Sequence, residues 1–176
     1  MNANEVIANR ANEIAGKKLC HPNDDINMSQ SSNDTFPTAM HISAVIALED
    51  KLIPAAELLI DTFKRLEKEN EGIVKSGRTH LQDAVPISFS QEISGWRSSL
   101  ERDIELIKLA IEPLRELALG GTAVGTGLNA PKGFDTKVAE EVSKLTGKKF
   151  VTAGNKFHAL RSEEHTSELQ SLAYLV

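Results

Sequence analysis

Cysteine, positive charge and long apolar runs are scarce in this chain, and each shortage excludes a class of protein. One cysteine occurs in 176 residues, so no disulfide can form within the chain, and a reducing compartment fits. Lysine and arginine (20) are outnumbered by aspartate and glutamate (25), and no basic block indicates nucleic acid or a membrane surface. No apolar run approaches a membrane span, and residues 1–5 lack the apolar core of a signal peptide. We therefore expect no nucleic-acid or membrane partner.

Aromatic residues are also scarce, and this shortage bears on the fold. They make up 5% of the chain, whereas alanine, leucine, isoleucine, glutamate and lysine are abundant. Such a composition favours helices packed on helices over a β-sandwich. No stretch alternates apolar and polar residues for long enough to predict a sheet. The sequence predicts an all-α protein, long enough for one domain with a substantial core.

Apolar residues at helical spacing predict where the helices lie. The segments expected to be helical are residues 4–15, residue 34 or 35 to about 70, about 87 to 114, and about 133–146, with polar loops at 17–33 and 75–86. Pro54 should bend or locally break the second helix. The two long helices carry apolar seams with alternating steps of three and four, which are half of a helical bundle. We expect the parent protein to oligomerise through these seams. Alternatively, a part of the protein outside this chain completes the bundle within one subunit, and the two possibilities are compatible.

A dense polar cluster at residues 27–36 directly precedes the second helix. Asp34 or Asn33 is expected to cap this helix, with Pro37 in its first turn. The free N–H groups and the positive dipole end of the helix form an anion site that requires no lysine or arginine. Neighbouring side chains supply further neutral donors, namely Ser31, Ser32 and Asn33. Taken alone, these residues fit an ordinary helix cap that binds nothing better than they fit an anion site.

Two histidines lie in other polar segments. His80 follows Thr79 in a loop and, because histidine titrates near neutral pH, it can position or deprotonate a water molecule. By spacing alone, a single loop histidine is more often structural or solvated. The second cluster contains Lys18, His21, Asn23 and Asp24, and its Pro-Asn-Asp sequence also favours a simple turn.

The glycine-rich segment 120–129 has neither of the common nucleotide-binding patterns. It follows a predicted helix and lacks both the P-loop sequence and the dinucleotide-binding sequence in a strand–turn–helix setting. A tight connection between packed helices is therefore the better interpretation. Whether this segment also lines a site is not established by the sequence, and the candidates are Thr122, Thr126 and Asn129.

Four polar stretches together resemble the class II fumarases of the fumarase/aspartase superfamily. They are His-Pro-Asn-Asp at 21–24, the run at 27–40, Gly-Arg-Thr-His-Leu-Gln-Asp-Ala at 77–84, and the segment 116–129. They occur in the family's order and at about its spacing, within a similarity from residue 2 to about 160. The resemblance implies a long-helix bundle of the fumarase/aspartase type, with residues 1–33 ending an N-terminal domain and 34–160 beginning the central helical domain. It also implies a homotetramer whose active sites each draw residues from three subunits.

The same resemblance implies a lyase that reversibly hydrates fumarate to (S)-malate, a tricarboxylic acid cycle reaction, by acid–base chemistry without a metal or redox cofactor. In the family, the residues matching Thr79 and His80 bind the substrate and its attacking water. The positions matching Ser31, Ser32 and Asn33 bind the substrate carboxylates. A secondary dicarboxylate site corresponds to His21, Asn23, Asp24 and Lys18, where Lys18 replaces the arginine of many members.

Two alternatives remain at this level. Aspartate ammonia-lyase shares the scaffold, although Ser32 argues against it because aspartases usually carry threonine there. Helical periodicity alone also fits a non-catalytic interaction module. The family's catalytic serine loop and the acidic partner of His80 match no part of this chain, so we expect the chain alone to be inactive. We expect a cytoplasmic location, or a mitochondrial one if a targeting segment has been lost.

Both ends of the chain depart from the family. Residues 4–11 match an internal stretch of fumarases, so Met1 is expected to be an internal methionine or the start assigned to a truncated gene. The resemblance stops abruptly at Arg161, and residues 161–171 back-translate to a common sequencing adapter. We therefore expect residues 161–176 to be a non-native tail.

Overall fold

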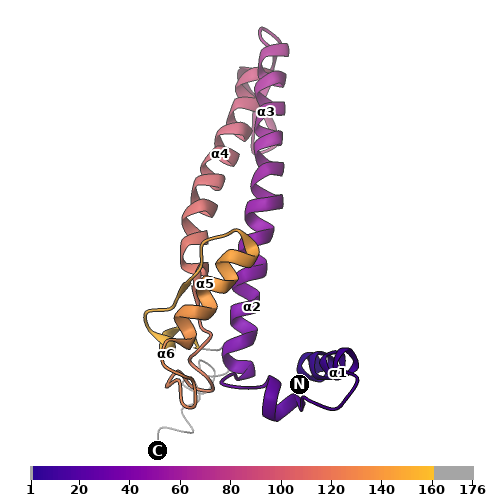
Figure 1. The fold of residues 1–176 in the computed structure, drawn as a ribbon. Helices are drawn as coiled ribbons and strands as arrows, with labels where there is room; N and C mark the ends of the chain where they lie inside the picture. The colour runs from indigo at the N-terminus through magenta and orange to yellow at the C-terminus, as the bar shows by residue number, and fades with distance from the viewer. Residues whose placement is uncertain (1, 161–176) are drawn as a thin grey trace, which may run out of the picture. The chain divides into compact units, whose positions relative to one another are not determined.

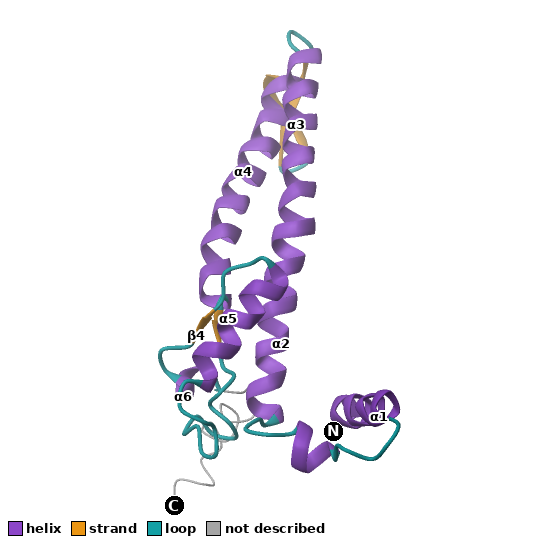
Figure 2. Cartoon of the chain, viewed as in Figure 1, coloured by secondary structure: helices purple, strands orange, loops and turns teal. Residues whose placement is uncertain are grey.

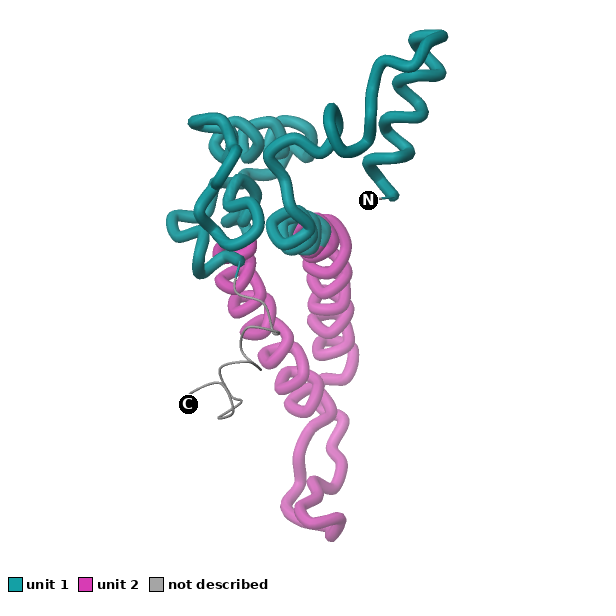
Figure 3. The backbone as a smooth tube through the Cα atoms, turned by 90° about the horizontal axis from the view of Figure 1, so that it is seen from below, with its two compact units in different colours: residues 1–43, 115–176 teal, residues 44–114 magenta. Residues whose placement is uncertain are grey.

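The computed structural model describes residues 2–160, and the predicted non-native tail lies outside the described residues. Helices predominate (Figures 1 and 2). The chain divides into two compact units, one from residues 44–114 and one from the segments on either side (Figure 3). The elements, in order, are α1 (Asn2–Ala15), η1 (Pro22–Ile26), α2 (Ser32–Ala47), η2 (Leu48–Leu52), α3 (Ile53–Glu69), β1 (Val74–Thr79), β2 (Gln82–Ser88), α4 (Phe89–Leu114), β3 (Glu116–Leu117), α5 (Phe134–Thr146), β4 (Val151–Thr152) and α6 (Lys156–Ala159).

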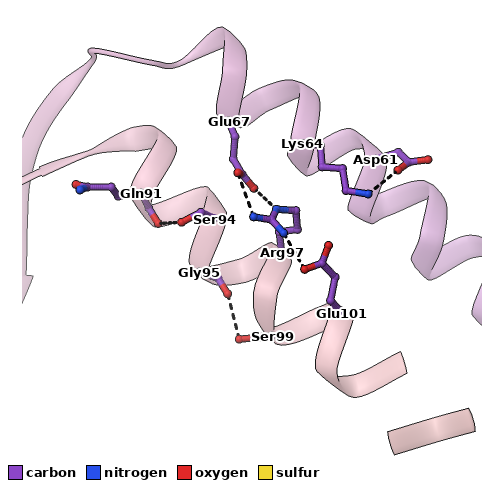
Figure 4. Close-up of polar contacts among 9 residues, drawn as sticks. All are labelled: Asp61, Lys64, Glu67, Gln91, Ser94, Gly95, Arg97, Ser99 and Glu101. Atoms are coloured by element: carbon purple, nitrogen blue, oxygen red, sulfur yellow. Dashed lines mark hydrogen bonds and ion pairs between the residues drawn. The ribbon is translucent and has the colours of Figure 1, made fainter. Parts of the chain in front are cut away.

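Helices α3 and α4 lie side by side in the unit formed by residues 44–114 (Figure 1). Isoleucines line the buried strip between them: Ile53 and Ile60 on α3, and Ile93, Ile104 and Ile111 on α4. Near the β-hairpin end of this pair, Arg97 on α4 donates from Nε to Glu67 on α3 at 2.5 Å and from Nη1 to Glu101 at 2.7 Å (Figure 4). The apolar strip and this charged bridge hold the two helices in register.

The break expected at Pro54 takes the form of a wider helical turn. Between α2 and α3, the π-helical segment η2 carries the hydrogen bond from the Ile53 N–H to the Leu48 carbonyl. Leu52 and Ile53 both keep right-handed helical backbone angles. A π turn accommodates a local change in the hydrogen-bond ladder without ending the helix. The helix therefore continues past the proline, which sits at the start of α3 and has no N–H to donate.

The polar loop predicted at residues 75–86 is wrong, because this segment forms an antiparallel hairpin. Strand β1 pairs with β2, with a register shift between Ser76 and Arg78. His80 and Leu81 form the two-residue turn, with φ of 50° and 63°. Both residues thus have the positive φ that a type I′ hairpin turn requires, although that turn usually contains Asn-Gly. The strands are mostly exposed on both faces, so the sequence has no apolar alternation to reveal them.

The other unit has its core around a two-residue parallel pair and helix α5. Strand β3 pairs with β4, and α5 is flanked by Gly133 and Gly147, both with left-handed backbone angles. Apart from Ala8 of α1, the buried apolar residues described in this unit are Leu117, Ala118, Ala139, Phe150, Ala153 and Leu160. At the other end of this unit, the Asn12 side chain of α1 bonds the backbone of Leu19 and Cys20 and so fixes the loop that leads to η1.

Candidate functional site at the start of helix α2

The N-terminus of α2 is closed by a reciprocal pair of hydrogen bonds. The Asn33 N–H donates to Ser31 Oγ at 3.2 Å, and the Ser31 N–H donates to Asp34 Oδ1 at 2.8 Å. This is a capping box, with aspartate in place of the usual glutamate or glutamine. The predicted cap at Asp34 or Asn33 is therefore wrong: Ser31 caps the helix, and Pro37 lies beyond its first turn. The Ser31 hydroxyl accepts one bond and keeps its own hydrogen to donate.

Asp34 also joins α2 to the glycine-rich segment. Its side chain is fully buried, and Oδ2 accepts the N–H groups of Gly120 at 3.1 Å and Thr122 at 2.9 Å. One turn further along α2, Thr38 Oγ1 accepts the Leu119 N–H at 3.0 Å. A carboxylate that receives three backbone hydrogen bonds is satisfied despite its burial. Asp34 thus links two segments that are far apart in the sequence.

A pocket lies between these two segments. Ser29 Oγ donates to the Asn129 carbonyl and Asn33 Nδ2 donates to the Ala123 carbonyl, each at 2.9 Å. The cavity that we call the Ser31–Thr122 pocket has a volume of about 410 Å³ and is lined by Asn27, Ser29, Gln30, Ser31, Thr122, Ala123, Val124, Thr126, Leu128 and Asn129. Its lining contains hydroxyls and amides but no charged side chain. The candidates left open by the sequence in segment 120–129 therefore share a cavity with Ser31.

A second cavity also includes Ser31. It has a volume of about 400 Å³ and is lined by Ala3, Asn4, Asn27, Gln30, Ser31, Ser32 and Thr35. Of these two cavities, Ser32 lines only the second, whereas the Asn33 side chain donates to the Ala123 carbonyl. The three neutral donors predicted from the sequence are therefore adjacent in the chain but have different surroundings.

Lys156 supports the glycine-rich segment from the side of α6. Its Nζ donates to the carbonyls of Leu117 and Leu119 at 2.9 Å each, and to Thr152 Oγ1 at 2.5 Å. Burial lowers the pKa of Lys156, and the carboxylates of Asp135 and Asp34 oppose that shift. The backbone of residues 117–122 thus has its carbonyls held by a cation and its N–H groups held by an anion. Sequence reasoning missed this lysine because its partners are backbone atoms of a distant segment.

Glycine is required at position 120 for two reasons. Gly120 has φ of 95°, which residues with a side chain rarely adopt. A Cβ atom at this position would lie 2.4 Å from the Cβ of Asp135. The close approach of the backbone to α5 allows the next residues to reach Asp34.

Thr79 and His80 lie in the other compact unit. Thr79 ends β1, and His80 occupies the first position of the hairpin turn with φ of 50°. A positive φ is uncommon for a residue other than glycine, and such strain is concentrated at functional positions. Both residues are exposed. The chain therefore carries its predicted water-activating histidine and its predicted carboxylate-binding serines on separate units.

The second polar cluster folds into the π-helical turn η1. His21 precedes this turn, and its Nδ1 lies 3.4 Å from the Asn23 nitrogen and 3.0 Å from Asp24 Oδ2. The structure therefore brings together three of the residues predicted for this cluster. No hydrogen bond or ion pair within residues 2–160 joins Lys18 to them.

Comparison with known proteins identifies the family. A family model described as lyase matches residues 1–176. The chain belongs to this lyase family. A class II fumarate hydratase of Helicobacter pylori is 59% identical over 169 residues, which cover 93% of this chain and 36% of the relative. A mitochondrial fumarate hydratase of Dictyostelium discoideum is 53% identical over 175 residues, covering 96% of this chain and 36% of the relative. The chain thus spans about 36% of the length of these relatives.

Solved structures of lyases show the same fold. A class II fumarase from Schistosoma mansoni superposes with a TM-score of 0.84 at 41% identity, covering 90% of this chain and 37% of that one. A structure described as fumarate lyase:delta crystallin from Brucella melitensis, bound to cobalt, gives a TM-score of 0.84 at 37% identity, with 98% and 39% covered. The predicted resemblance to class II fumarases and the predicted helical fold of that superfamily are confirmed.

Two further properties concern only the part of this lyase chain that the structure describes. In residues 2–160, no helix is both long enough and apolar enough to cross a membrane. Within the same residues, no group of three or more histidine, cysteine, aspartate or glutamate side chains is arranged to hold a metal ion.

Proposed function

We propose that the complete protein to which this lyase segment belongs interconverts fumarate and (S)-malate. The observation that carries the proposal is the start of α2, where the Ser31 hydroxyl and the helix N-terminus face neutral cavities. Such donors bind a carboxylate without a positively charged side chain. Relatives named fumarate hydratase, at 53% to 59% identity, support the same reaction. The proposal requires no metal or redox cofactor.

The proposed chemistry needs carboxylate binding and proton transfer. Water adds to one alkene carbon, and a proton is delivered to the carbon beside the other carboxylate. That carboxylate takes on enolate-like charge in the transition state, so fixed donors beside it lower the barrier. We assign carboxylate binding to Ser31, Ser32 and Asn33, and positioning of the attacking water to Thr79 and His80. The proton-abstracting base is expected from the part of the protein beyond this chain.

A homotetramer would supply the two parts of this site from different subunits. Helices α3 and α4 carry large apolar side chains that remain between 44% and 70% exposed, namely Leu58, Leu59, Trp96, Leu106 and Leu109. Exposed apolar strips of this kind are typical of surfaces that pack against another helix. Light scattering on the complete protein is expected to give four subunits, and a stable monomer would refute this assignment.

Two finer assignments accompany the proposal. His21, Asn23 and Asp24, with Lys18, are proposed as a secondary dicarboxylate site, and alanine at His21 should weaken binding there without changing kcat. A cytoplasmic location is proposed, with a mitochondrial one as the alternative because the Dictyostelium relative is named as mitochondrial. Fractionation of the native host distinguishes the two compartments.

The test of the proposed reaction begins with the gene. Long-read sequencing across the codon for Arg161 should recover the complete reading frame, which is then expressed in a host without its own fumarase. The complete protein should form malate from fumarate, whereas the 176-residue chain should form none. Replacing His80 with asparagine should lower kcat by about 10²- to 10⁴-fold. Ammonia release from aspartate without malate formation would instead favour aspartate ammonia-lyase. If the complete protein showed neither activity, the non-catalytic helical module would be the remaining interpretation.

A further inference from the structure

Thr122 has an unusual environment for a threonine. It is only 9% exposed, yet it lines the Ser31–Thr122 pocket. No hydrogen bond among residues 2–160 uses its hydroxyl, although buried polar groups nearly always have a partner. Since no fully enclosed side-chain polar atom in the described chain lacks a partner, the hydroxyl retains contact with solvent. A donor that is buried against protein but open to a cavity is suited to receive a ligand.

One carboxylate holds Thr122 in place across from Ser31. Asp34 accepts the Ser31 N–H on Oδ1 and the Thr122 N–H on Oδ2, so both residues are anchored to the same rigid group. The tethers from Ser29 to Asn129 and from Asn33 to Ala123 further fix the two walls. Preorganised donors lose little freedom when a ligand binds, and this increases affinity. The backbones of Ser31 and Thr122 are thus held in place before a ligand arrives.

The chemistry of the pocket restricts its ligand. Its lining is uncharged, and Val124 and Leu128 add apolar surface beside the hydroxyls. In the described residues, the N–H groups of Ala123 and Val124 have no hydrogen-bond partner and follow Thr122 directly. The charge of the nearby Asp34 is compensated by its three N–H donors and by Lys156. Neutral donors beside apolar surface suit a carboxylate on a short carbon skeleton.

We propose that Thr122 binds the substrate by donating a hydrogen bond from its hydroxyl to a carboxylate oxygen of the dicarboxylate, in the pocket that it shares with Ser31. This proposal rests on the proposed fumarate chemistry. It assigns a role to the glycine-rich segment beyond that of a connection. Removal of a hydrogen bond to a charged group should weaken binding of fumarate about 10- to 100-fold. Because the contact exists in both ground state and transition state, KM should rise while kcat changes little.

The experiment compares three variants of the complete protein. Thr122→Val removes the hydroxyl and keeps the shape, Thr122→Ser keeps the hydroxyl, and Thr136→Val makes the same chemical change on an exposed position of α5 outside the pocket. Kinetics should show the raised KM only in Thr122→Val. Calorimetric titration with fumarate should show the same weakening of direct binding. Amide hydrogen exchange of Gly120 and Thr122 should be unchanged in all three variants.

Each other outcome has a defined meaning. An unchanged KM in Thr122→Val, or equal losses in the valine and serine variants, overturns the assignment of Thr122. Loss of amide protection in Thr122→Val that Thr122→Ser does not restore shows a structural role and also overturns it. If the unmodified protein binds fumarate without forming malate, the proposed reaction fails while the calorimetric comparison still decides the role of Thr122. If it binds no fumarate, both proposals are overturned.

Discussion

Replacing Asp34 with alanine removes an acceptor shared by three backbone N–H groups, those of Ser31, Gly120 and Thr122. The last two are buried, and a buried donor deprived of its charged acceptor costs about 1.5–3 kcal/mol. The Ser31 N–H lies beside a cavity and can rehydrate, so it adds less. We expect the free energy of opening the 117–122 segment to fall by about 3–5 kcal/mol. Asparagine keeps one acceptor oxygen and should cost about half as much.

Amide hydrogen exchange on the complete protein measures this change locally. A loss of about 3 kcal/mol corresponds to exchange that is roughly 100-fold faster at Gly120 and Thr122. The matched control is Asp61→Ala, which removes a carboxylate whose side chain is 73% exposed and should leave these amides protected. Unchanged exchange in Asp34→Ala would contradict the role assigned to this residue. Equal losses of protection in the alanine and asparagine variants would contradict the expectation that one remaining acceptor oxygen preserves part of the stability.

Three further changes test other contacts. Thr152→Val removes the hydroxyl that donates to Asp135 at 2.9 Å. Burial alone would raise the Asp135 pKa, but the Thr152 hydroxyl, backbone N–H groups and Lys156 lower it overall. The ionised carboxylate therefore stabilises the fold at pH values above its ordinary pKa, and this stabilisation is lost as the pH falls. Urea titrations should therefore show a deficit in Thr152→Val at neutral pH that shrinks below about pH 4, and a deficit independent of pH would contradict this. Arg97→Ala should lower the thermal midpoint, with Arg97→Lys intermediate because lysine lacks the planar fork; equal midpoints would exclude a stabilising bridge. Gly120→Ala should destabilise the protein by about 2 kcal/mol or more, and by more than Gly133→Ala, whose added Cβ would have no neighbour within 4 Å.

The helices were predictable from sequence because apolar side chains repeat along a single face of each one. The predicted start of the second helix is two to three residues later in the chain than the observed start. Every residue from 31 to 34 is a good cap, and only the hydrogen bonds show that Ser31 fills that role. The β-hairpin escaped prediction because its strands face solvent and its turn contains His80 and Leu81 rather than asparagine and glycine. Local patterns thus located the helices but could not resolve their ends.

Of the two walls of the candidate site, only the one at the start of α2 could be proposed from local sequence. Ser31 and its neighbours could be proposed from chemistry that is local in the chain. The residues of the opposite wall could be named only as candidates, because Asp34 and its partners in the glycine-rich segment are separated by 86 and 88 residues. Thr122 and Lys156 acquire their roles only when those distant segments meet. Sequence separation, rather than any unusual residue type, concealed these roles.

The turn at His80 and Leu81 shows a conflict between the stability of the hairpin and the retention of the His80 imidazole. A left-handed backbone costs a residue other than glycine about 1–2 kcal/mol, so a glycine-containing turn would form a more stable hairpin. Any such replacement at the first turn position would also remove the imidazole at the tip of the hairpin. A design procedure that optimises stability alone would therefore rewrite this turn and delete the group proposed to activate water. Stabilisation of this hairpin should instead be sought in the strands, leaving the strained tip unaltered.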